Sequence, residues 1–401
     1  MDKAQELHLS SGMSASRILV VGAGFSGAVI ARELAERLDA KIVIIDERDH
    51  VAGNCHTERD ADTGVMVHKY GAHIFHTSRE DVWKYVTRFS DFGPYVNRVK
   101  ASTPRGVFPL PINLMTINHF FGRRFSPAEA RKFIATLGDP SIGEPRNFEE
   151  QALKFVGREL YETFFYGYTK KQWGCEPREL AASLLKRLPV RFNYDDSYFS
   201  DRYQGIPVDG YTAIVQRLLD HEKIEVKTGT PWQDGMGADF AHVIFTGPID
   251  GYYGHRFGRL GYRTVYWDRA VHDGDFQGNA VINYPDPGVP HTRMVEHKHF
   301  APWETHEKTV VFTEYSKETT PTDAPFYPKR LAPDRALLDQ YLALARAETN
   351  VSFVGRLATY RYLDMHQVVA EALDFAPRLA EAIRAGHPRP VLPEIEKEVS
   401  A

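Results

Sequence analysis

Three glycines near the start of the chain have the spacing of a phosphate-binding turn. Gly22, Gly24 and Gly27 follow a short apolar run and precede a segment with apolar residues at helical spacing. Such a turn needs glycine where the backbone bends, where it approaches a pyrophosphate and where helix packs on strand. Asp46 ends the next apolar run, where a carboxylate can accept hydrogen bonds from ribose hydroxyls. The pattern predicts a dinucleotide-binding βαβ unit.

Residues beyond this unit favour FAD over a nicotinamide dinucleotide. Asp46 is followed by Arg48 and by the turn Gly53-Asn54, an order found in many FAD-binding proteins. An apolar run at 351–354 leads to Gly355-Arg356 and a further helix. Arg356 would suit a pyrophosphate, although an arginine in this position could equally be an ordinary surface residue.

The elements that must position these residues change in kind along the chain. Strand–helix alternation gives way to helical patterns at 127–137, 148–165 and 178–188, then to short alternating strands between about 252 and 315. We expect an α/β fold with a discontinuous Rossmann-type FAD-binding domain, an inserted helical domain and an antiparallel β-sheet domain. The expected ranges are 14–91, 203–250 and 335–397 for the first, 111–190 for the second, and 92–110, 191–202 and 251–334 for the third.

Composition excludes several classes of function. The 401 residues carry a net charge of −4, without the basic excess of a nucleic-acid-binding protein. The two cysteines, Cys55 and Cys175, form no CxxC pair, which argues against a disulfide scaffold or a thiolate zinc site. The first sixteen residues are polar and no apolar run reaches the length of a membrane span. We expect a cytoplasmic enzyme with no membrane or nucleic-acid partner.

Five stretches together resemble the UDP-galactopyranose mutases, over about residues 16–385. They are VGAGFSG at 21–27, GAHIFHT at 71–77, GYTKKQW at 167–173, TR with EHKHF at 292–300, and GR with YRYLDM at 355–365. The first is shared by many flavoproteins and the others in this order are specific. The compact length and single helical insert resemble the bacterial type.

The resemblance implies a flavin that acts as a nucleophile. In this family, N5 of reduced FAD attacks the anomeric carbon of UDP-galactopyranose or UDP-galactofuranose and expels UDP. The sugar ring opens, recloses through a different hydroxyl, and UDP returns without net redox change. The resemblance also implies NAD(P)H or another reductant and a homodimer. It leaves open whether UDP-N-acetylgalactosamine is a further substrate.

The family pattern assigns roles residue by residue. Arg187 and Arg293 match the arginines that hold the pyrophosphate, and His76 matches a histidine beside flavin and sugar, so these three form the catalytic set. Phe164, Phe165 and Tyr168 match positions around the uracil, and Trp173 matches the tryptophan of a mobile lid. The other substrate-binding residues implied are Asn97, Arg263, Asn283, Tyr327, Tyr362 and Asp364. The FAD-binding set is Gly22, Gly24, Phe25, Ser26, Gly27, Asp46, Arg48, Gly53, Asn54, His73, Gly355, Arg356, Tyr362, Leu363, Asp364 and Met365.

The same residues allow other interpretations. An aromatic stripe at helical spacing is usually core, and Tyr161, which precedes Phe164 and Phe165, is expected to be a core residue only. Within a strand, His297 and His299 would share a face, but no further ligand set accompanies them and we expect no metal. An amine-oxidase-like FAD oxidoreductase is the alternative enzyme, and a flavin-bound scaffold or sensor the non-enzymatic one. Ala52 departs from the family pattern, where many relatives have a second glycine before Gly53.

Overall fold

A five-stranded parallel sheet gathers segments that are far apart in the sequence. The structure, a computed structural model, describes residues 16–187 and 189–394. The strand order is β10-β2-β1-β11-β17, with every neighbouring pair parallel. The strands are β1 (Ser16–Val21), β2 (Ala40–Ile45), β10 (Ile224–Lys227), β11 (His242–Phe245) and β17 (Val351–Phe353). This arrangement confirms the predicted α/β class with a Rossmann-type domain that is discontinuous in sequence.

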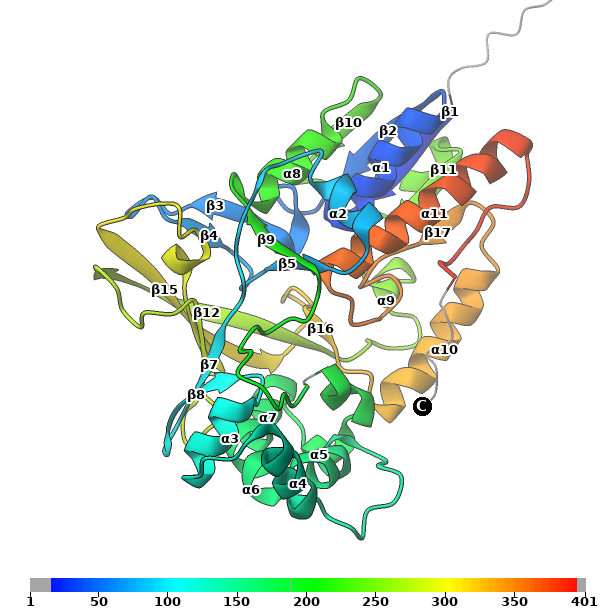
Figure 1. Ribbon diagram of the computed structural model, residues 1–401. Helices are drawn as coiled ribbons and strands as arrows, with labels where there is room; N and C mark the ends of the chain where they lie inside the picture. The colour runs from blue at the N-terminus through cyan, green and yellow to red at the C-terminus, as the bar shows by residue number, and fades with distance from the viewer. Residues whose placement is uncertain (1–15, 188, 395–401) are drawn as a thin grey trace, which may run out of the picture.

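Helices cover both faces of this sheet, which explains why its strands are apolar throughout. Successive side chains of a strand point to opposite faces, so Ile18 and Val20 of β1 pack against one helical layer and Leu19 and Val21 against another. The first layer contains α1 (Phe25–Arg37), α8 (Gly210–Leu219) and α11 (Met365–Ala385), and the second contains α10 (Ala332–Arg346) and α9 (Ile249–Tyr252). Figure 1 shows the sheet and its first helical layer at the top of the molecule, with the short helix α2 (Glu80–Val86) beside α11 and with α10 lower on the right.

The second large sheet is mixed. Its order is β16-β12-β15-β14-β13-β7-β8, and all neighbouring pairs are antiparallel except β13 and β7, which run parallel. The strands are β7 (Val99–Thr103), β8 (Gly106–Leu110), β12 (Tyr262–Asp273), β13 (Val281–Asn283), β14 (Arg293–Glu296), β15 (Lys308–Glu318) and β16 (Tyr327–Pro328). The expected antiparallel sheet therefore exists, with one parallel pair where the chain returns from residue 281 to lie beside residue 99.

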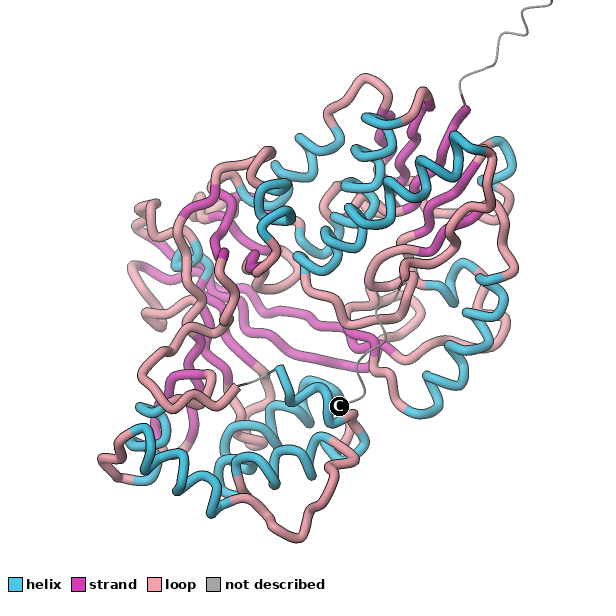
Figure 2. The backbone as a smooth tube through the Cα atoms, turned by 45° about the vertical axis from the view of Figure 1, so that its right-hand side comes forward, coloured by secondary structure: helices cyan, strands magenta, loops and turns pink. Residues whose placement is uncertain are grey.

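Two small sheets connect the large ones. One pairs β3 (Thr57–Arg59) with β4 (Met66–His68), and the other has the order β5-β9-β6. The strands of the second are β5 (Phe75–Thr77), β6 (Phe92–Gly93) and β9 (Tyr203–Pro207). In Figure 2 the strands form a continuous band between the helices of the Rossmann-type unit and a separate group of helices.

That separate group is the inserted helical segment. It contains α3 (Leu114–Phe121), α4 (Pro127–Leu137), α5 (Phe148–Val156), α6 (Arg158–Leu160), a π-helix (Tyr161–Tyr166) and α7 (Gly167–Trp173). The helix expected at 127–137 is present, whereas 148–165 is divided into three pieces. The helix expected at 178–188 is wrong: two 3-10 turns stand there, Pro177–Glu179 and Ala182–Arg187, and residue 188 lies outside the described residues.

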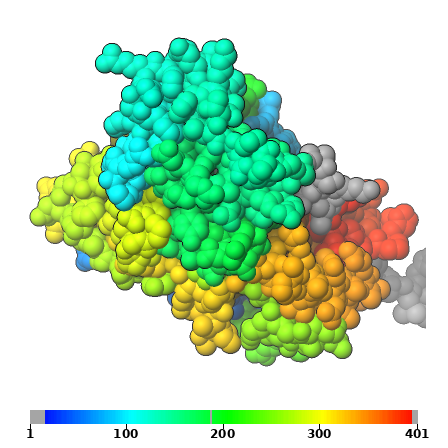
Figure 3. All heavy atoms as spheres, turned by 90° about the horizontal axis from the view of Figure 1, so that it is seen from below, coloured from blue at the N-terminus to red at the C-terminus, as the bar shows by residue number. Residues whose placement is uncertain are grey.

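From below, the helical segment lies toward the viewer beside the yellow and orange residues of the later chain (Figure 3). We keep the division into three units as a proposal. Within residues 16–187 and 189–394, no helix has both the length and the apolar character needed to cross a bilayer.

Candidate active site

One cavity of about 1330 Å³ is lined by residues from the Rossmann-type unit, the mixed sheet and the helical segment. It brings together most of the residues singled out in the sequence. Those that line it are Gly22, Gly24, Phe25, Ser26, Asp46, Arg48, Gly53, Asn54, His73, His76, Asn97, Phe164, Phe165, Tyr168, Trp173, Asn283, Arg293, Tyr327, Arg356, Tyr362, Leu363, Asp364 and Met365. Gly27, Gly355 and Arg263 are not part of its lining. The side chain of Arg187 lies outside the described part of the chain.

The glycine turn in the cavity wall is built as its spacing predicts. Gly22 has φ of +104°, and a Cβ there would lie 2.1 Å from Thr246 Oγ1. A Cβ on Gly27 would lie 1.9 Å from the carbonyl oxygen of Gly22, so this glycine lets α1 approach the turn. Gly24, by contrast, has no atom nearer than Gly53 Cα at 4.0 Å. The backbone at Gly24 thus has open space beside it, as a ligand in close approach requires.

The acid of the motif is already oriented by the backbone. Asp46 Oδ2 accepts a hydrogen bond from Ala23 N at 2.8 Å, and Oδ1 accepts one from Arg48 N at 2.9 Å. Ala52 adopts φ of +74°, a region that glycine favours. The alanine therefore occupies a strained position where relatives with glycine would have none.

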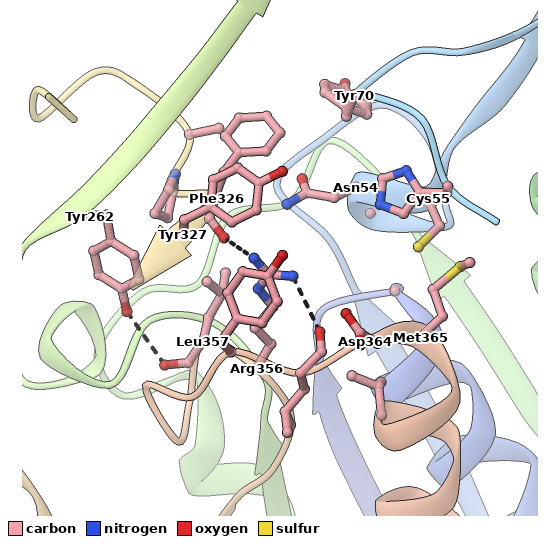
Figure 4. Close-up of a pocket in the computed structure, with 18 of the residues that line it drawn as sticks. Asn54, Cys55, Tyr70, Tyr262, Phe326, Tyr327, Arg356, Leu357, Asp364 and Met365 are labelled. Carbon is pink, nitrogen blue, oxygen red and sulfur yellow. Dashed lines mark hydrogen bonds between the residues drawn. The ribbon is translucent and has the colours of Figure 1, made fainter. Parts of the chain in front are cut away.

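Two arginines that line the cavity each have a buried side-chain nitrogen without a hydrogen-bond partner among the described residues. Arg48 Nη2 donates to Asn54 Oδ1 at 2.8 Å, while its Nη1 is buried with no hydrogen-bond partner among the described residues. Arg356 donates to the carbonyl oxygens of Leu363 and Phe326 at 3.2 and 2.8 Å, and its Nε is buried and likewise unpaired within residues 16–187 and 189–394. Figure 4 shows Arg356 beside Tyr327 and Phe326. Unpaired buried N–H groups are costly unless a ligand binds them, and guanidinium groups suit pyrophosphate.

Arg293, which also lines the cavity, is a largely buried cation paired with a fully buried anion. Its Nη2 lies 2.8 Å from Glu314 Oε2, and the Glu314 side chain has no exposed surface. Burial works against the charge of Arg293, but the Glu314 carboxylate raises the pKa of this guanidinium well above its ordinary value. Nε of Arg293 is a further buried nitrogen that finds no partner in the described chain. The group presents a permanent positive charge to the cavity.

A π-helical turn positions the aromatic residues. The wider turn at Tyr161–Tyr166 directs Phe164 and Phe165 to the cavity, whereas Tyr161 is 2% exposed within the helical core and is absent from the cavity lining. Such π-turns occur frequently at functional sites. Tyr168 follows in α7 and also lines the cavity, where burial raises the pKa of its hydroxyl far above the ordinary value.

Three aromatic rings gather near Arg356. Tyr327 and Tyr362 are stacked with centroids 5.7 Å apart, and Trp173 lies 6.3 and 6.4 Å from them. The Arg356 guanidinium lies 5.0 and 4.6 Å from the two tyrosine rings. Burial raises the pKa of Tyr327 to about 12, so its hydroxyl is a neutral hydrogen-bond donor at pH 7.

The two histidines of the GAHIFHT stretch are held differently. His73 Nδ1 lies 2.7 Å from the carbonyl oxygen of Gly71, and burial lowers the pKa of His73 to about 4, so the ring is neutral with Nδ1–H as the donor. His76 Nδ1 lies 2.6 Å from Asp201 Oδ2 and its ring stacks on Phe199 at 3.6 Å. Hydrogen bonds from the Ser78 hydroxyl and His76 outweigh burial and lower the pKa of Asp201. An ionised Asp201 therefore orients His76 at the cavity wall.

Sequence reasoning missed four residues of the site: Tyr198, Phe199, Asp201 and Glu314. The first three line the cavity, and Glu314 supports Arg293 from the neighbouring strand, where the two residues are paired in register. The adjacent aromatics Tyr198-Phe199 were a usable signal. Glu314 was not recognisable without the strand register.

The remaining residues have plain structural contacts. Asn97 is 3% exposed at the cavity wall, and the backbone N–H of Asp364 donates to Gln367 Oε1 at 2.9 Å just before α11. His297 and His299 stand in a 3-10 turn (His297–Phe300), not in a strand. The Glu296 carboxylate accepts N–H groups of Phe276, Gln277 and Gly278, and thus holds a loop.

Comparison with known proteins agrees with this geometry. The family model described as UDP-galactopyranose mutase matches residues 163–362, and that of the NAD(P)-binding Rossmann-like domain matches residues 20–89. A Klebsiella pneumoniae protein described as a probable UDP-galactopyranose mutase is 52% identical over 379 residues, which cover 94% of this chain and 98% of the relative. A dTDP-fucopyranose mutase of Escherichia coli is 50% identical over 368 residues, covering 90% and 97%. A crystal structure of reduced UDP-galactopyranose mutase has the same fold, with a TM-score of 0.70 at 16% identity over 92% of this chain and 96% of that one. The chain belongs to the UDP-galactopyranose mutase family.

Proposed function

We propose that the protein interconverts UDP-galactopyranose and UDP-galactofuranose with FAD in its reduced form and without net redox change. The observation that carries the proposal is the shared cavity, which joins the dinucleotide turn to Arg293 and the tyrosine cluster. A flavin bound at the dinucleotide turn would share this cavity with a nucleotide sugar bound by Arg293 and the tyrosines. The family expectation of a homodimer in the cytoplasm, supplied with electrons by NAD(P)H or another reductant, is part of the proposal.

The residues present fit FAD. Gly24 leaves open space for a pyrophosphate, and the unpaired Nη1 of Arg48 and Nε of Arg356 can donate to it. Asp46 retains acceptor capacity for ribose hydroxyls. Reduced FAD, when bound, would supply N5 as the nucleophile toward the anomeric carbon.

The chain's own contribution is to hold the diphosphate and exclude water. Arg293, with Arg187 as its proposed partner, would bind the UDP pyrophosphate while it leaves and returns, which requires fixed positive charge in a dry site. The hydroxyls of Tyr168, Tyr327 and Tyr362 would donate hydrogen bonds to phosphate oxygens. Trp173 would close the cavity over the substrate.

The flavin-proximal residues orient the sugar and control protons. His76, held by Asp201 at Nδ1, presents Nε2 at a fixed angle, and neutral His73 is an acceptor through Nε2. We propose Asn97, Asn283 and Asp364 as contacts to the hexose or its nucleotide. Phe164 and Phe165 would stack on the pyrimidine. For Arg263 the contacts favour a different role, described below.

A dTDP-sugar is the second candidate substrate. The Escherichia coli dTDP-fucopyranose mutase is 50% identical to this chain, close to the 52% of the Klebsiella relative. Both substrates join a pyrimidine nucleoside diphosphate to a hexose, and Arg293 and the tyrosines would bind either diphosphate.

The test is an anaerobic assay with two substrates. Dithionite-reduced protein is incubated with UDP-galactofuranose or with dTDP-fucofuranose, and the products are separated by chromatography. We expect UDP-galactopyranose from the first and little turnover of the second, with no turnover by the oxidised protein. Conversion of the dTDP-sugar alone would overturn the proposed substrate, and conversion of neither would overturn the mutase activity.

A further inference from the structure

Helix α7, which carries Tyr168 and Trp173, rests on the turn between β13 and β14. A Cβ on Gly167, its first residue, would lie 2.1 Å from the carbonyl oxygen of Pro285 and 2.9 Å from the ring of Pro287. The start of the helix is thus in backbone contact with this turn, and only glycine fits there.

Lys171 makes a second contact one helical turn later. Its Nζ lies 2.6, 2.9, 2.8 and 2.9 Å from the carbonyl oxygens of Tyr284, Asp286, Val289 and His291. An ammonium group has three N–H donors and no acceptor, so these four acceptors use all of its hydrogen-bonding capacity. Four carbonyl dipoles directed at one point repel one another unless a cation lies between them. The ammonium therefore organises the β13–β14 turn around itself.

Residues of the proposed site flank both partners in this contact. Asn283 ends β13 and Arg293 begins β14, and the two are paired in register at the base of the turn. Lys171 itself lies between Tyr168 and Trp173 in α7. One ammonium group thus joins the segment that supplies Arg293 to the segment that supplies Trp173.

Arg263 holds the end of the same helix from the mixed sheet. Its Nε donates to the carbonyl oxygen of Gln172 at 3.1 Å and its Nη2 to that of Lys171 at 3.3 Å. Gly174, with φ of +66°, ends the helix against this guanidinium, and a Cβ there would lie 2.2 Å from Arg263 Nη1. Lys171 and Arg263 together fix both the position and the end of α7.

We propose that Lys171 is a positioning residue for the reaction: its ammonium group, in a cage of four main-chain carbonyls, sets the distance between Arg293 and Trp173 across the diphosphate site. The proposal rests on the proposed function for its kinetic consequences. Its structural consequence, a defined turn at 284–291 and a defined α7, holds without any ligand.

The first test measures amide hydrogen exchange in the ligand-free flavoprotein. In Lys171→Met we expect faster exchange in 167–174 and 283–293 and unchanged exchange in the five-stranded sheet. The matched control is Lys170→Met, because Lys170 is the exposed neighbour whose Nζ pairs with Glu176 at 2.6 Å. Equal exchange in Lys171→Met and wild type would overturn the proposal, whatever substrate the enzyme uses.

The second test is kinetic. For Lys171→Met we expect KM for the nucleotide sugar to rise about tenfold to a hundredfold with flavin still bound, since small misplacements of binding groups have effects of that size. Lys171→Ala should regain part of the loss when propylammonium is added, whereas Lys170→Met should match wild type. A KM unchanged in both Lys171 variants would overturn the role. Absence of turnover in wild type would instead overturn the proposed function and leave the exchange result to decide on Lys171.

If Lys171→Met does not retain flavin, Lys171→Arg replaces it in both tests. The guanidinium keeps the charge, but its N–H groups lie in one plane on three nitrogens, so they cannot radiate from a single nitrogen to the surrounding carbonyls. We expect an intermediate rise in exchange and in KM. A wild-type result for Lys171→Arg together with full activity of Lys171→Ala without propylammonium would overturn the proposal.

Discussion

Arg293 places a permanent positive charge in a largely buried part of the cavity, and the Glu314 carboxylate compensates that charge. Glu314 is fully buried, and it also receives contacts from Trp267 Nε1 at 3.3 Å and Thr292 Oγ1 at 3.3 Å. A buried ion pair of this kind adds little stability in itself, but removing one partner leaves an uncompensated buried charge. Arg293 therefore affects the stability of the fold as well as the proposed binding of the diphosphate.

Removing Arg293 alone should damage both stability and turnover, and a double variant separates the two effects. We expect Arg293→Met to lower the free energy of unfolding by about 3–5 kcal/mol, because Glu314 is left unpaired. Arg293→Met combined with Glu314→Gln should regain most of that stability. Turnover should fall about a hundredfold or more in both, because the charge proposed to bind the diphosphate is lost.

Denaturant unfolding and the anaerobic assay, with bound flavin measured by absorbance, check this prediction. Retained turnover in either variant would remove Arg293 from the site. An unfolding free energy equally low in the single and double variants would show that Glu314 is not the group that Arg293 neutralises.

The single residues that the sequence could not predict are those that act through a partner. His76 and Asp201 lie 125 positions apart in the chain, and Glu314 faces Arg293 only because β14 and β15 pair in one register out of several possible. Family resemblance assigned Arg263 to the substrate site, but its hydrogen bonds go to main-chain carbonyls of α7 and to the side chains of Ser316 and Glu318. Motifs predict the residues that face a ligand better than those that support them.

At the scale of elements, sequence patterns predicted those features that neighbouring residues determine, such as where a helix begins. The helix at 127–137 begins with a capping box at Ser126 and Glu129, which a sequence displays directly. The segment 148–165 is interrupted because Gly157 takes φ of +77° where a Cβ would lie 2.4 Å from Leu137 O. The parallel pairing of β13 with β7 depends on contacts between distant segments, so no local pattern indicated it.

The turn between β1 and α1 gives a prediction at the scale of elements, because Gly27 is needed for helix packing whereas Gly24 leaves space for a ligand. Gly27→Ala should lower the unfolding free energy of the apoprotein by about 1–3 kcal/mol, since its Cβ overlaps Gly22 O and α1 must move away. A Cβ at position 24 would have space, and the backbone there is extended, which alanine accepts. The Gly24→Ala apoprotein should therefore be as stable as the wild type or about 0.4–1 kcal/mol more stable.

Both variants should bind little FAD, which flavin absorbance after reconstitution measures. Loss of FAD from a stable Gly24→Ala protein would show that the new methyl group occupies ligand space. Full FAD content in Gly24→Ala would contradict the placement of the pyrophosphate at this turn.

At the scale of the whole molecule, buried histidines lie where its parts meet. His68 of β4 stacks on Phe300 at 4.7 Å, and His297 packs between His68 and Phe312, at 6.0 and 4.4 Å. Burial lowers the pKa of His297 to about 4. His73, in the cavity between the units, has its pKa lowered to about 4 by the same cause. The fold therefore requires these rings to be neutral.

This requirement predicts a loss of stability in mild acid. The unfolded chain binds a proton at each histidine below about pH 6.5, whereas folded His297 and His73 stay neutral until about pH 4. The unfolded state therefore binds more protons in that window, and the free energy of unfolding should fall by about 2 kcal/mol per histidine between pH 6.5 and pH 5. Glu296, whose pKa is lowered to about 2, changes the free energy of unfolding only below pH 4.5, so it does not contribute to the fall between pH 6.5 and pH 5.

Urea unfolding of the apoprotein at pH 7 and pH 5 measures the fall in unfolding free energy. The variant His297→Phe keeps a ring but cannot titrate, so it should reduce the fall by about the share of one histidine. An equal fall in the variant and wild type would mean that His297 is protonated within the folded protein.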